Sequence, residues 1–327
     1  PPSPKPPYST YSIDAMMHTK RLLQWTAGLL LAAAPALAFA QTGPGGVGDA
    51  SSLKLWLRAD AGVYTDAGVT LATDNQPVQE WHDQSSQGSK FRQTTPASRP
   101  TYKTSFVNGY PAIQLDGVDD FIGTSINGGD LSEDFTVFII GRFGNLNQPA
   151  NDWDFMICVG GGYVGTNKSL SISRTPGNYP GGANRYFTYD GGGYKFGQTV
   201  EGQKWSVFSE KYFTALPRHK AWADGTQSTV SGASGTLQTN GLFEIGRYTS
   251  GNNQHFKGEV AEVIVYDYAL NDAERIAVQN YLASKYDLTV VDDKYAYEST
   301  HRNDLIGIGR SSLNNNHIAT QGAGLLT

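Results

Sequence analysis

Hydrophobic and polar positions alternate along most of this chain, and the clearest such stretch lies near the C-terminus. Residues 259–268 are rich in β-branched and aromatic side chains, which predicts a strand. In an ideal strand Val260 and Ile264 share one face. Ala261 and Val263 share the other face, so the strand is apolar on both sides. This pattern is typical of a strand inside a sheet that is itself covered.

A helix is predicted directly after this strand. Asn271 is a good N-cap, and Glu274, three residues later, can bond back to the backbone N–H of the cap. Four less polar residues follow at helical spacing: Ala273, Ile276, Ala277 and Tyr281. We therefore expect one narrow stripe of the helix to dock on the sheet.

Further strands are predicted from alternation toward the N-terminus. Leu53, Leu55 and Leu57 recur with a period of two, so we expect one aliphatic face. Trp81 and Phe91 are predicted core residues. Turn signals recur at roughly ten-residue spacing between residues 100 and 250, which favours a sandwich or jelly roll over βαβ units.

Four segments resemble a known family. They are LKLWLRADAGV at 53–63, VQEWHDQSSQG at 78–88, NGYPAIQLDGVDDFI at 108–122 and the closing strand and helix up to Leu288. In this order they resemble the bacterial LamG-like domains, a concanavalin A-like jelly-roll group related to laminin G modules and pentraxins. The resemblance implies an all-β, concanavalin A-like jelly-roll β-sandwich with one short C-terminal helix. It does not fix the ligand.

The N-terminal region predicts export. A basic start, an apolar run and the small-x-small sequence Ala38-Phe39-Ala40 make residues 17–40 a cleavable signal peptide, so we expect a secreted or cell-surface protein. We interpret residues 1–16 as an upstream, non-native extension. Residues 41–50 are a predicted flexible leader, 51–289 the LamG-like domain, and 290–327 the start of a following β-rich module in a longer modular protein.

Composition narrows the range of partners. The 327 residues carry a formal net charge of −5 and show no basic field, so nucleic acid is not an expected partner. No membrane span is expected in the mature chain. Cys158 is the single cysteine, which excludes an intrachain disulfide, and we expect a buried thiol. Zinc patterns of paired cysteines or HExxH are absent from the sequence.

One acidic segment is a candidate metal site. Asp116, Asp119 and Asp120 place three carboxylates within five residues at a predicted turn, and Ca²⁺ prefers such hard oxygen ligands. Related jelly rolls often hold a structural calcium at a loop rim, so the resemblance also implies Ca²⁺. The alternative is a turn in which aspartate side chains bond their own backbone.

A segment rich in glycine, tyrosine and asparagine is the candidate ligand-binding region. It covers residues 160–197, and its candidate contacts are Tyr163, Tyr179, Asn184, Tyr186, Tyr189 and Tyr194. Aromatic faces stack on sugar rings or peptide while amides form hydrogen bonds. Equally, some of these rings could cap the sandwich from its edge strands.

The concanavalin A-like fold that the resemblance implies also houses glycosidases and lyases. A retaining glycosidase needs two carboxylates about 5–5.5 Å apart, and no Glu-x-Asp-x-x-Glu signature is found. His82 and Asp83 are strand neighbours pointing to opposite faces, which is poor geometry for a catalytic pair. Glu262 is interpreted as structural. We predict a non-catalytic recognition or adhesion module for carbohydrate or matrix glycoprotein, with a carbohydrate-active enzyme or a structural spacer as alternatives.

Overall fold

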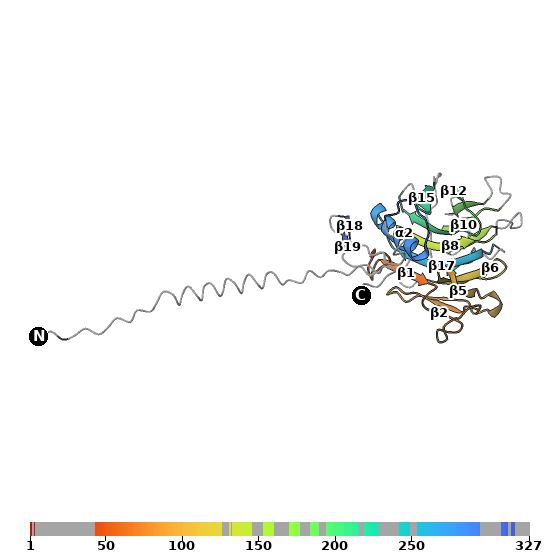
Figure 1. The fold of residues 1–327 in the computed structure, drawn as a ribbon, viewed down its shortest axis with the longest axis horizontal. Helices are drawn as coiled ribbons and strands as arrows, with labels where there is room; N and C mark the ends of the chain where they lie inside the picture. The colour runs from red at the N-terminus through yellow and green to blue at the C-terminus, as the bar shows by residue number, and fades with distance from the viewer. Residues whose placement is uncertain are drawn as a thin grey trace. The chain divides into compact units, whose positions relative to one another are not determined.

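The protein is described by a computed structural model. It describes Pro1, Ser3 and residues 43–125, 131, 133–145, 153–159, 170–176, 184–189, 194–215, 219–228, 242–248, 254–294, 309–312 and 315–317. The chain divides into two units, residues 1–39 and residues 40–327, and all but two of the described residues belong to the second. The second unit is built almost wholly from strands over its described residues (Figure 1).

Two antiparallel sheets make up this unit. The eight-stranded sheet has the order β15-β14-β13-β8-β17-β6-β5, with β1 paired to β17. Its strands are β1 (Leu53–Arg58), β5 (Thr101–Val107), β6 (Tyr110–Asp116), β8 (Phe135–Phe143), β13 (Trp205–Tyr212), β14 (His219–Ala223), β15 (Thr226–Ser228) and β17 (Lys257–Tyr266). A hairpin of β18 (Gly309–Ser312) and β19 (Asn315–His317) stands outside both sheets.

The second sheet has nine strands in the order β12-β11-β10-β9-β16-β7-β4-β3-β2. They are β2 (Val63–Tyr64), β3 (Glu80–His82), β4 (Lys90–Arg92), β7 (Ile122–Ser125), β9 (Asp154–Val159), β10 (Leu170–Arg174), β11 (Arg185–Tyr189), β12 (Tyr194–Thr199) and β16 (Leu242–Ile245). A short 3-10 helix, η1 (Pro96–Ser98), follows β4.

The inner faces of the two sheets enclose the main hydrophobic core. Leu55 and Leu57 enter it from β1, and Trp81 and Phe91 enter it from β3 and β4; all four are 0% exposed. Leu53 instead lies on the outer face, because the register between β1 and β17 shifts after it. The fold is an all-β jelly-roll sandwich, as predicted.

A β-bulge in β17 changes which of its residues face the core. The register between β17 and β8 shifts between Val260 and Glu262. The one extra residue reverses the face to which the following side chains point. Val260 therefore lies in the inner core with Val263, whereas Ile264 lies on the outer face. The prediction that Val260 and Ile264 share a face is wrong, because ideal alternation contains no bulge.

Helix α2 (Asp272–Tyr286) covers the outer face of the eight-stranded sheet (Figure 1). The side chain of Asn271 accepts a hydrogen bond from the Glu274 backbone N–H, and the Glu274 carboxylate accepts one from the Asn271 backbone N–H, both at 3.0 Å. This reciprocal capping box confirms the predicted start of the helix.

The docked face of α2 differs from the predicted stripe. Val278, Tyr281, Leu282 and Lys285 are all nearly buried, and their spacing of i, i+3, i+4 and i+7 is that of one helix face. Three of the four predicted stripe residues are instead exposed or half-buried: Ala273, Ile276 and Ala277. The prediction failed because every residue from Val278 to Tyr286 is buried, polar ones included, so no narrow apolar stripe defines the docked surface.

Glu262 explains how a lysine can lie there. Its side chain is 0% exposed, and its carboxylate accepts four hydrogen bonds at the interface between sheet and helix. The donors are Trp56 Nε1 (2.6 Å), Tyr281 OH (3.1 Å), Lys285 Nζ (2.8 Å) and Tyr286 OH (2.8 Å). This confirms the interpretation of Glu262 as structural.

The predicted flexible leader is wrong over residues 43–49. Val47 is 0% exposed and belongs to the hydrophobic cluster under α2. The Tyr266 hydroxyl donates to the Val47 carbonyl at 3.3 Å. Burial of Val47 holds a glycine-rich segment that its composition alone would leave flexible.

The remaining domain boundaries stay predictions. The proposed signal segment, 17–40, lies outside the described residues, and so does most of the segment 295–327. Within the described part of the chain, no helix has both the length and the apolar character needed to cross a membrane.

Candidate functional site

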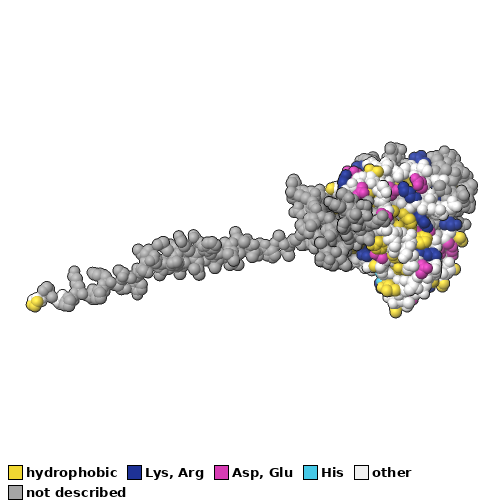
Figure 2. Space-filling view, viewed as in Figure 1, with side chains coloured by type: hydrophobic (Ala, Val, Ile, Leu, Met, Phe, Trp, Pro, Cys, Tyr) yellow, Lys and Arg dark blue, Asp and Glu magenta, His cyan; other side chains and the backbone are white. Residues whose placement is uncertain are grey.

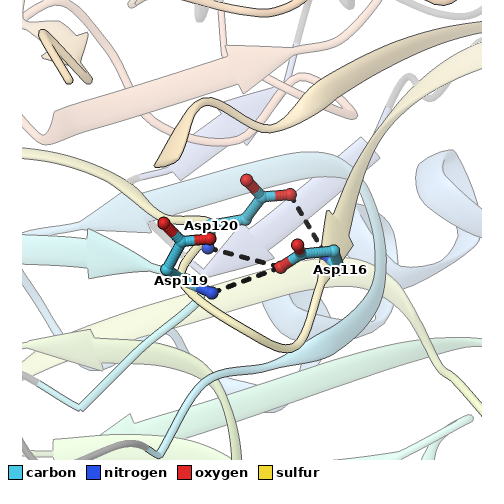
Figure 3. A group of neighbouring side chains, drawn as sticks. All are labelled: Asp116, Asp119 and Asp120. Carbon is cyan, nitrogen blue, oxygen red and sulfur yellow. Dashed lines mark hydrogen bonds between the residues drawn. The ribbon is translucent and has the colours of Figure 1, made fainter. Parts of the chain in front are cut away.

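The three predicted metal-binding carboxylates lie together in the turn between β6 and β7 (Figure 3). Gly117 has a φ of +79°, which glycine adopts without strain. Asp116 Oδ1 accepts the backbone N–H groups of Val118 (2.8 Å), Asp119 (3.3 Å) and Asp120 (3.4 Å). Asp120 Oδ2 accepts the Asp116 N–H at 3.1 Å. The alternative prediction of self-bonding aspartates therefore also holds.

The three aspartates of this turn differ in burial and in how readily they ionise. Burial, followed by repulsion from the Asp116 and Asp119 carboxylates, raises the pKa of Asp120 to about 7. Asp119 Oδ2 accepts a hydrogen bond from Ser98 Oγ of η1 at 2.8 Å, whereas Asp116 is exposed. A cation would offset the repulsion that keeps Asp120 partly protonated at neutral pH.

The geometry fits a calcium ion. One oxygen from each of the three aspartates lies within 4.8 Å of the others. Ca²⁺ binds oxygens at about 2.3–2.6 Å, so two ligand oxygens of one ion are at most about 5 Å apart. The exposed side of Asp116 leaves room for solvent or ligand oxygens to complete the coordination.

The outer face of the nine-stranded sheet carries a transverse row of charged residues. The register pairs Glu80 with Arg92, Arg92 with Gly123, and Gly123 with Glu244. Their sequence neighbours point into the core, so these residues face outward. Arg92 Nε donates to Glu80 at 2.8 Å and Arg247 Nη2 to Glu244 at 2.6 Å. Both carboxylates therefore have an arginine partner.

His82 joins this row through Glu80. Its Nε2 lies 2.6 Å from Glu80 Oε2, and its ring centroid lies 4.5 Å from that of Tyr64. Asp83 instead accepts the Trp56 backbone N–H at 2.8 Å. This confirms that His82 and Asp83 are not a pair. The pairing of His82 with Glu80 could have been predicted from the sequence, since residues two apart on a strand share a face.

The two carboxylates of the row do not have glycosidase spacing. Glu80 on β3 and Glu244 on β16 are separated by three strand intervals, or roughly 14 Å between backbones. A retaining pair needs about 5–5.5 Å and an inverting pair about 6.5–9.5 Å between carboxyl groups. No local sequence pattern reveals this row, because strand register, which brings Glu244 into line with Glu80, is a tertiary property.

A small aromatic cluster lies beside Glu244 on the same face. It comprises Phe155, Cys158 and Tyr248, with Trp153 packed against them. The rings of Phe155 and Tyr248 are 4.7 Å apart between centroids, and Cys158 pairs with Glu244 across β9 and β16. Cys158 is 0% exposed, which confirms the predicted buried thiol.

Tyr186 is not a surface residue, so its assignment as a ligand contact is corrected. It is 1% exposed, and its ring lies 5.6 Å from that of Phe208 in the core. Burial, and then the nearby Glu210 carboxylate, raise the pKa of Tyr186 well above its usual range. The alternation of β11 turns this ring inward, as the edge-capping alternative allowed.

The other predicted contacts are only partly placed. Tyr189 and Tyr194 are backbone partners at the ends of β11 and β12, although their side chains lie outside the described residues. Asn184 is half-buried and has a φ of +53° just before β11. Tyr163 and Tyr179 lie outside the described residues, so their roles stay predictions.

No protein-family model matches the chain, and no match to a curated protein was found. Among solved structures, a sialidase of Trypanosoma rangeli is similar with a TM-score of 0.48 and 15% sequence identity. The matched region covers 84% of this chain and 40% of the sialidase chain. The receptor-binding domain of botulinum neurotoxin type G has a TM-score of 0.45 and 10% identity, covering 71% of this chain and 51% of that one. Such similarity concerns the arrangement of strands and does not identify a ligand.

Proposed function

We propose that this chain is a secreted, LamG-like recognition module that binds carbohydrate or the glycans of a matrix glycoprotein. The signal-peptide pattern of residues 17–40 supports secretion, and the four ordered sequence segments support the LamG-like assignment. Binding, rather than catalysis, accounts better for carboxylates that each have an arginine partner and are far apart.

One observation carries this proposal: the two sheets differ in what covers them. Helix α2 and a hydrophobic cluster close the outer face of the eight-stranded sheet. The outer face of the nine-stranded sheet instead carries charged, hydroxyl and aromatic groups, and Glu80, Glu244 and Phe155 among them are nearly buried. On the one side of the molecule drawn in Figure 2, where no sheet is labelled, charged side chains of both signs are interspersed with uncharged polar and hydrophobic surface. Mixed polar and aromatic groups suit a ligand with many hydroxyls.

Calcium has an organising role in this proposal. Asp116, Asp119 and Asp120 would hold the ion at the β6–β7 turn, and its charge would fix the turn beside Ser98. Asn184, Tyr189 and Tyr194 remain proposed ligand contacts around β11 and β12.

The test is a glycan-array screen of the full chain in calcium and again with a chelator. We expect glycan binding that weakens at least several-fold when calcium is removed or when Asp119 is changed to asparagine. Asp66→Asn is the matched control. Asp66 also accepts two backbone N–H groups in a turn, at 2.8 and 2.9 Å, but lies outside the acidic cluster.

Two results would contradict parts of this proposal. A folded chain that binds no glycan in either condition would favour a structural spacer. Binding that is unchanged by chelator and by Asp119→Asn would retain carbohydrate recognition but remove the calcium role.

A further inference from the structure

We propose that Glu244 is the centre of a binding site for a neutral sugar on the outer face of the nine-stranded sheet. The inference rests on the proposed carbohydrate-binding function and specifies its location and ligand class. Glu244 is 4% exposed, and Oε1 accepts both Arg247 Nη2 (2.6 Å) and Arg247 Nε (3.2 Å). Its Oε2 is buried and has no hydrogen-bond partner within the described part of the chain. A buried acceptor without a donor is costly, so it points to a donor supplied by a ligand.

A glycine on the neighbouring strand makes room for the Glu244 side chain itself. Gly123 stands between Arg92 and Glu244 in the transverse row, and a Cβ there would lie 2.7 Å from Glu244 Cγ. The side chain of Arg247, which donates to this carboxylate, is 29% exposed, and that of Arg92, the backbone partner of Gly123, is 53% exposed. Glu244 therefore lies just below the surface and not deep in the core.

Further buried polar groups without a hydrogen-bond partner in the described part of the chain lie beside Glu244 on the same face. Cys158 pairs with Glu244 on one side and with Ser171 on the other, and Ser173 pairs with Phe155. The hydroxyls of Ser171 and Ser173 are also buried and lack partners among the described residues. An acceptor, two hydroxyls and adjacent aromatic rings match a sugar, whose hydroxyls form hydrogen bonds and whose C–H faces pack on rings.

Charge selects a neutral sugar. Glu80 and Glu244 balance Arg92 and Arg247 in this row, so there is no excess positive charge to hold an anion. A carboxylate or sulfate on the ligand would meet Glu244 Oε2, and like charges repel strongly where water is excluded. A neutral hydroxyl donates to Oε2 without this repulsion.

The experiment compares neutral oligosaccharides with their sialylated and sulfated counterparts on one array, using the full chain in calcium. We expect the neutral forms to bind more tightly, and Glu244→Gln to weaken their binding about 10-fold or more, as for a lost hydrogen bond to a charged group. Glu259→Gln is the matched control. Glu259 is also a nearly buried strand glutamate, and its oxygens accept Arg142 (2.7 Å) and Gln114 (3.1 Å) on the other sheet.

The outcomes separate this inference from the proposed function. If the chain binds glycans but Glu244→Gln, shown to be folded by its thermal unfolding, binds as the wild type does, the Glu244 site is wrong and carbohydrate recognition stands. Tighter binding of acidic glycans by the wild type would overturn it without need of a variant. A folded wild type that binds no glycan overturns both.

Discussion

At the residue scale, the position of helix α2 depends on a single buried carboxylate. Glu262 receives donors from β1 and from three positions of the helix, and Lys285 also lies 3.3 Å from Asp60. Buried ion pairs add little stability over an apolar replacement of the whole group, but removing one partner leaves the other charge uncompensated. Glu262 therefore stabilises the fold mainly by accepting hydrogen bonds from these buried donors.

Changing Glu262 to alanine should destabilise the fold by about 3–5 kcal/mol, because Lys285 loses one of its two acidic partners and the hydroxyls of Tyr281 and Tyr286 lose an acceptor. Urea unfolding of the full chain measures this. Glu262→Gln keeps an acceptor and should cost less, and the exposed Glu201→Ala should change the free energy of unfolding by under about 0.5 kcal/mol. A Glu262→Ala chain as stable as the wild type would contradict the structural role.

Asp120 predicts a pH dependence of stability. Its pKa is raised from an ordinary value of 3.8 to about 7 in the folded chain, so between these values the folded state holds a proton that the unfolded state releases. The contribution of this group to stability is therefore complete below about pH 4 and is lost as pH rises toward 7.

The measurement is the free energy of unfolding between pH 5 and 8 in chelator, for the wild type and Asp120→Asn. The stability of the wild type should fall relative to the variant as pH rises, and saturating calcium should reduce the difference. Parallel pH profiles in chelator would contradict the raised pKa.

At the scale of secondary-structure elements, local sequence determines where α2 begins, while tertiary contacts determine which side it docks. The capping box needs only Asn271 and Glu274, which are close in sequence. The docked face includes Lys285, whose buried charge is offset by Glu262 of β17 and by Asp60. The bulge in β17 similarly depends on pairing with β8.

Replacing Asn271 with alanine should lower the free energy of unfolding by about 1 kcal/mol, because one backbone N–H at the helix start loses its acceptor. Asn271→Asp keeps an oxygen at this position and should retain wild-type stability within a few tenths of a kcal/mol. Equal loss in both variants would show that the side chain acts through something other than the cap.

At the scale of the whole molecule, the two outer faces of the sandwich differ, because α2 covers one and the other carries a row of charged residues. The β6–β7 turn with its acidic cluster joins a strand of each sheet, since β6 belongs to the eight-stranded sheet and β7 to the nine-stranded one. An ion bound there would therefore stabilise the association of the two sheets.

Calcium should raise the free energy of unfolding, by about 2.7 kcal/mol when its concentration is one hundred times the dissociation constant. Thermal or urea unfolding at increasing calcium concentration tests this. The increase should be lost in Asp119→Asn and kept in Asp66→Asn. A stability that does not depend on calcium in the wild type would contradict the metal site.

The sequence by itself determined much of this protein. Alternation at Leu55 and Leu57, the capping box at Asn271 and the regular turn signals predicted strands, the helix start and the jelly roll, because these signals are local. The acidic cluster was also readable, since a single turn brings its three aspartates together.

Only the tertiary structure decided which faces and neighbours these residues have. A bulge reversed the predicted face of Val260, and the alternation of β11 buried Tyr186. Strand register aligned Glu80 with Glu244, which lie far apart in the sequence. Bulges and register follow from pairing between distant segments, so no local pattern contains them.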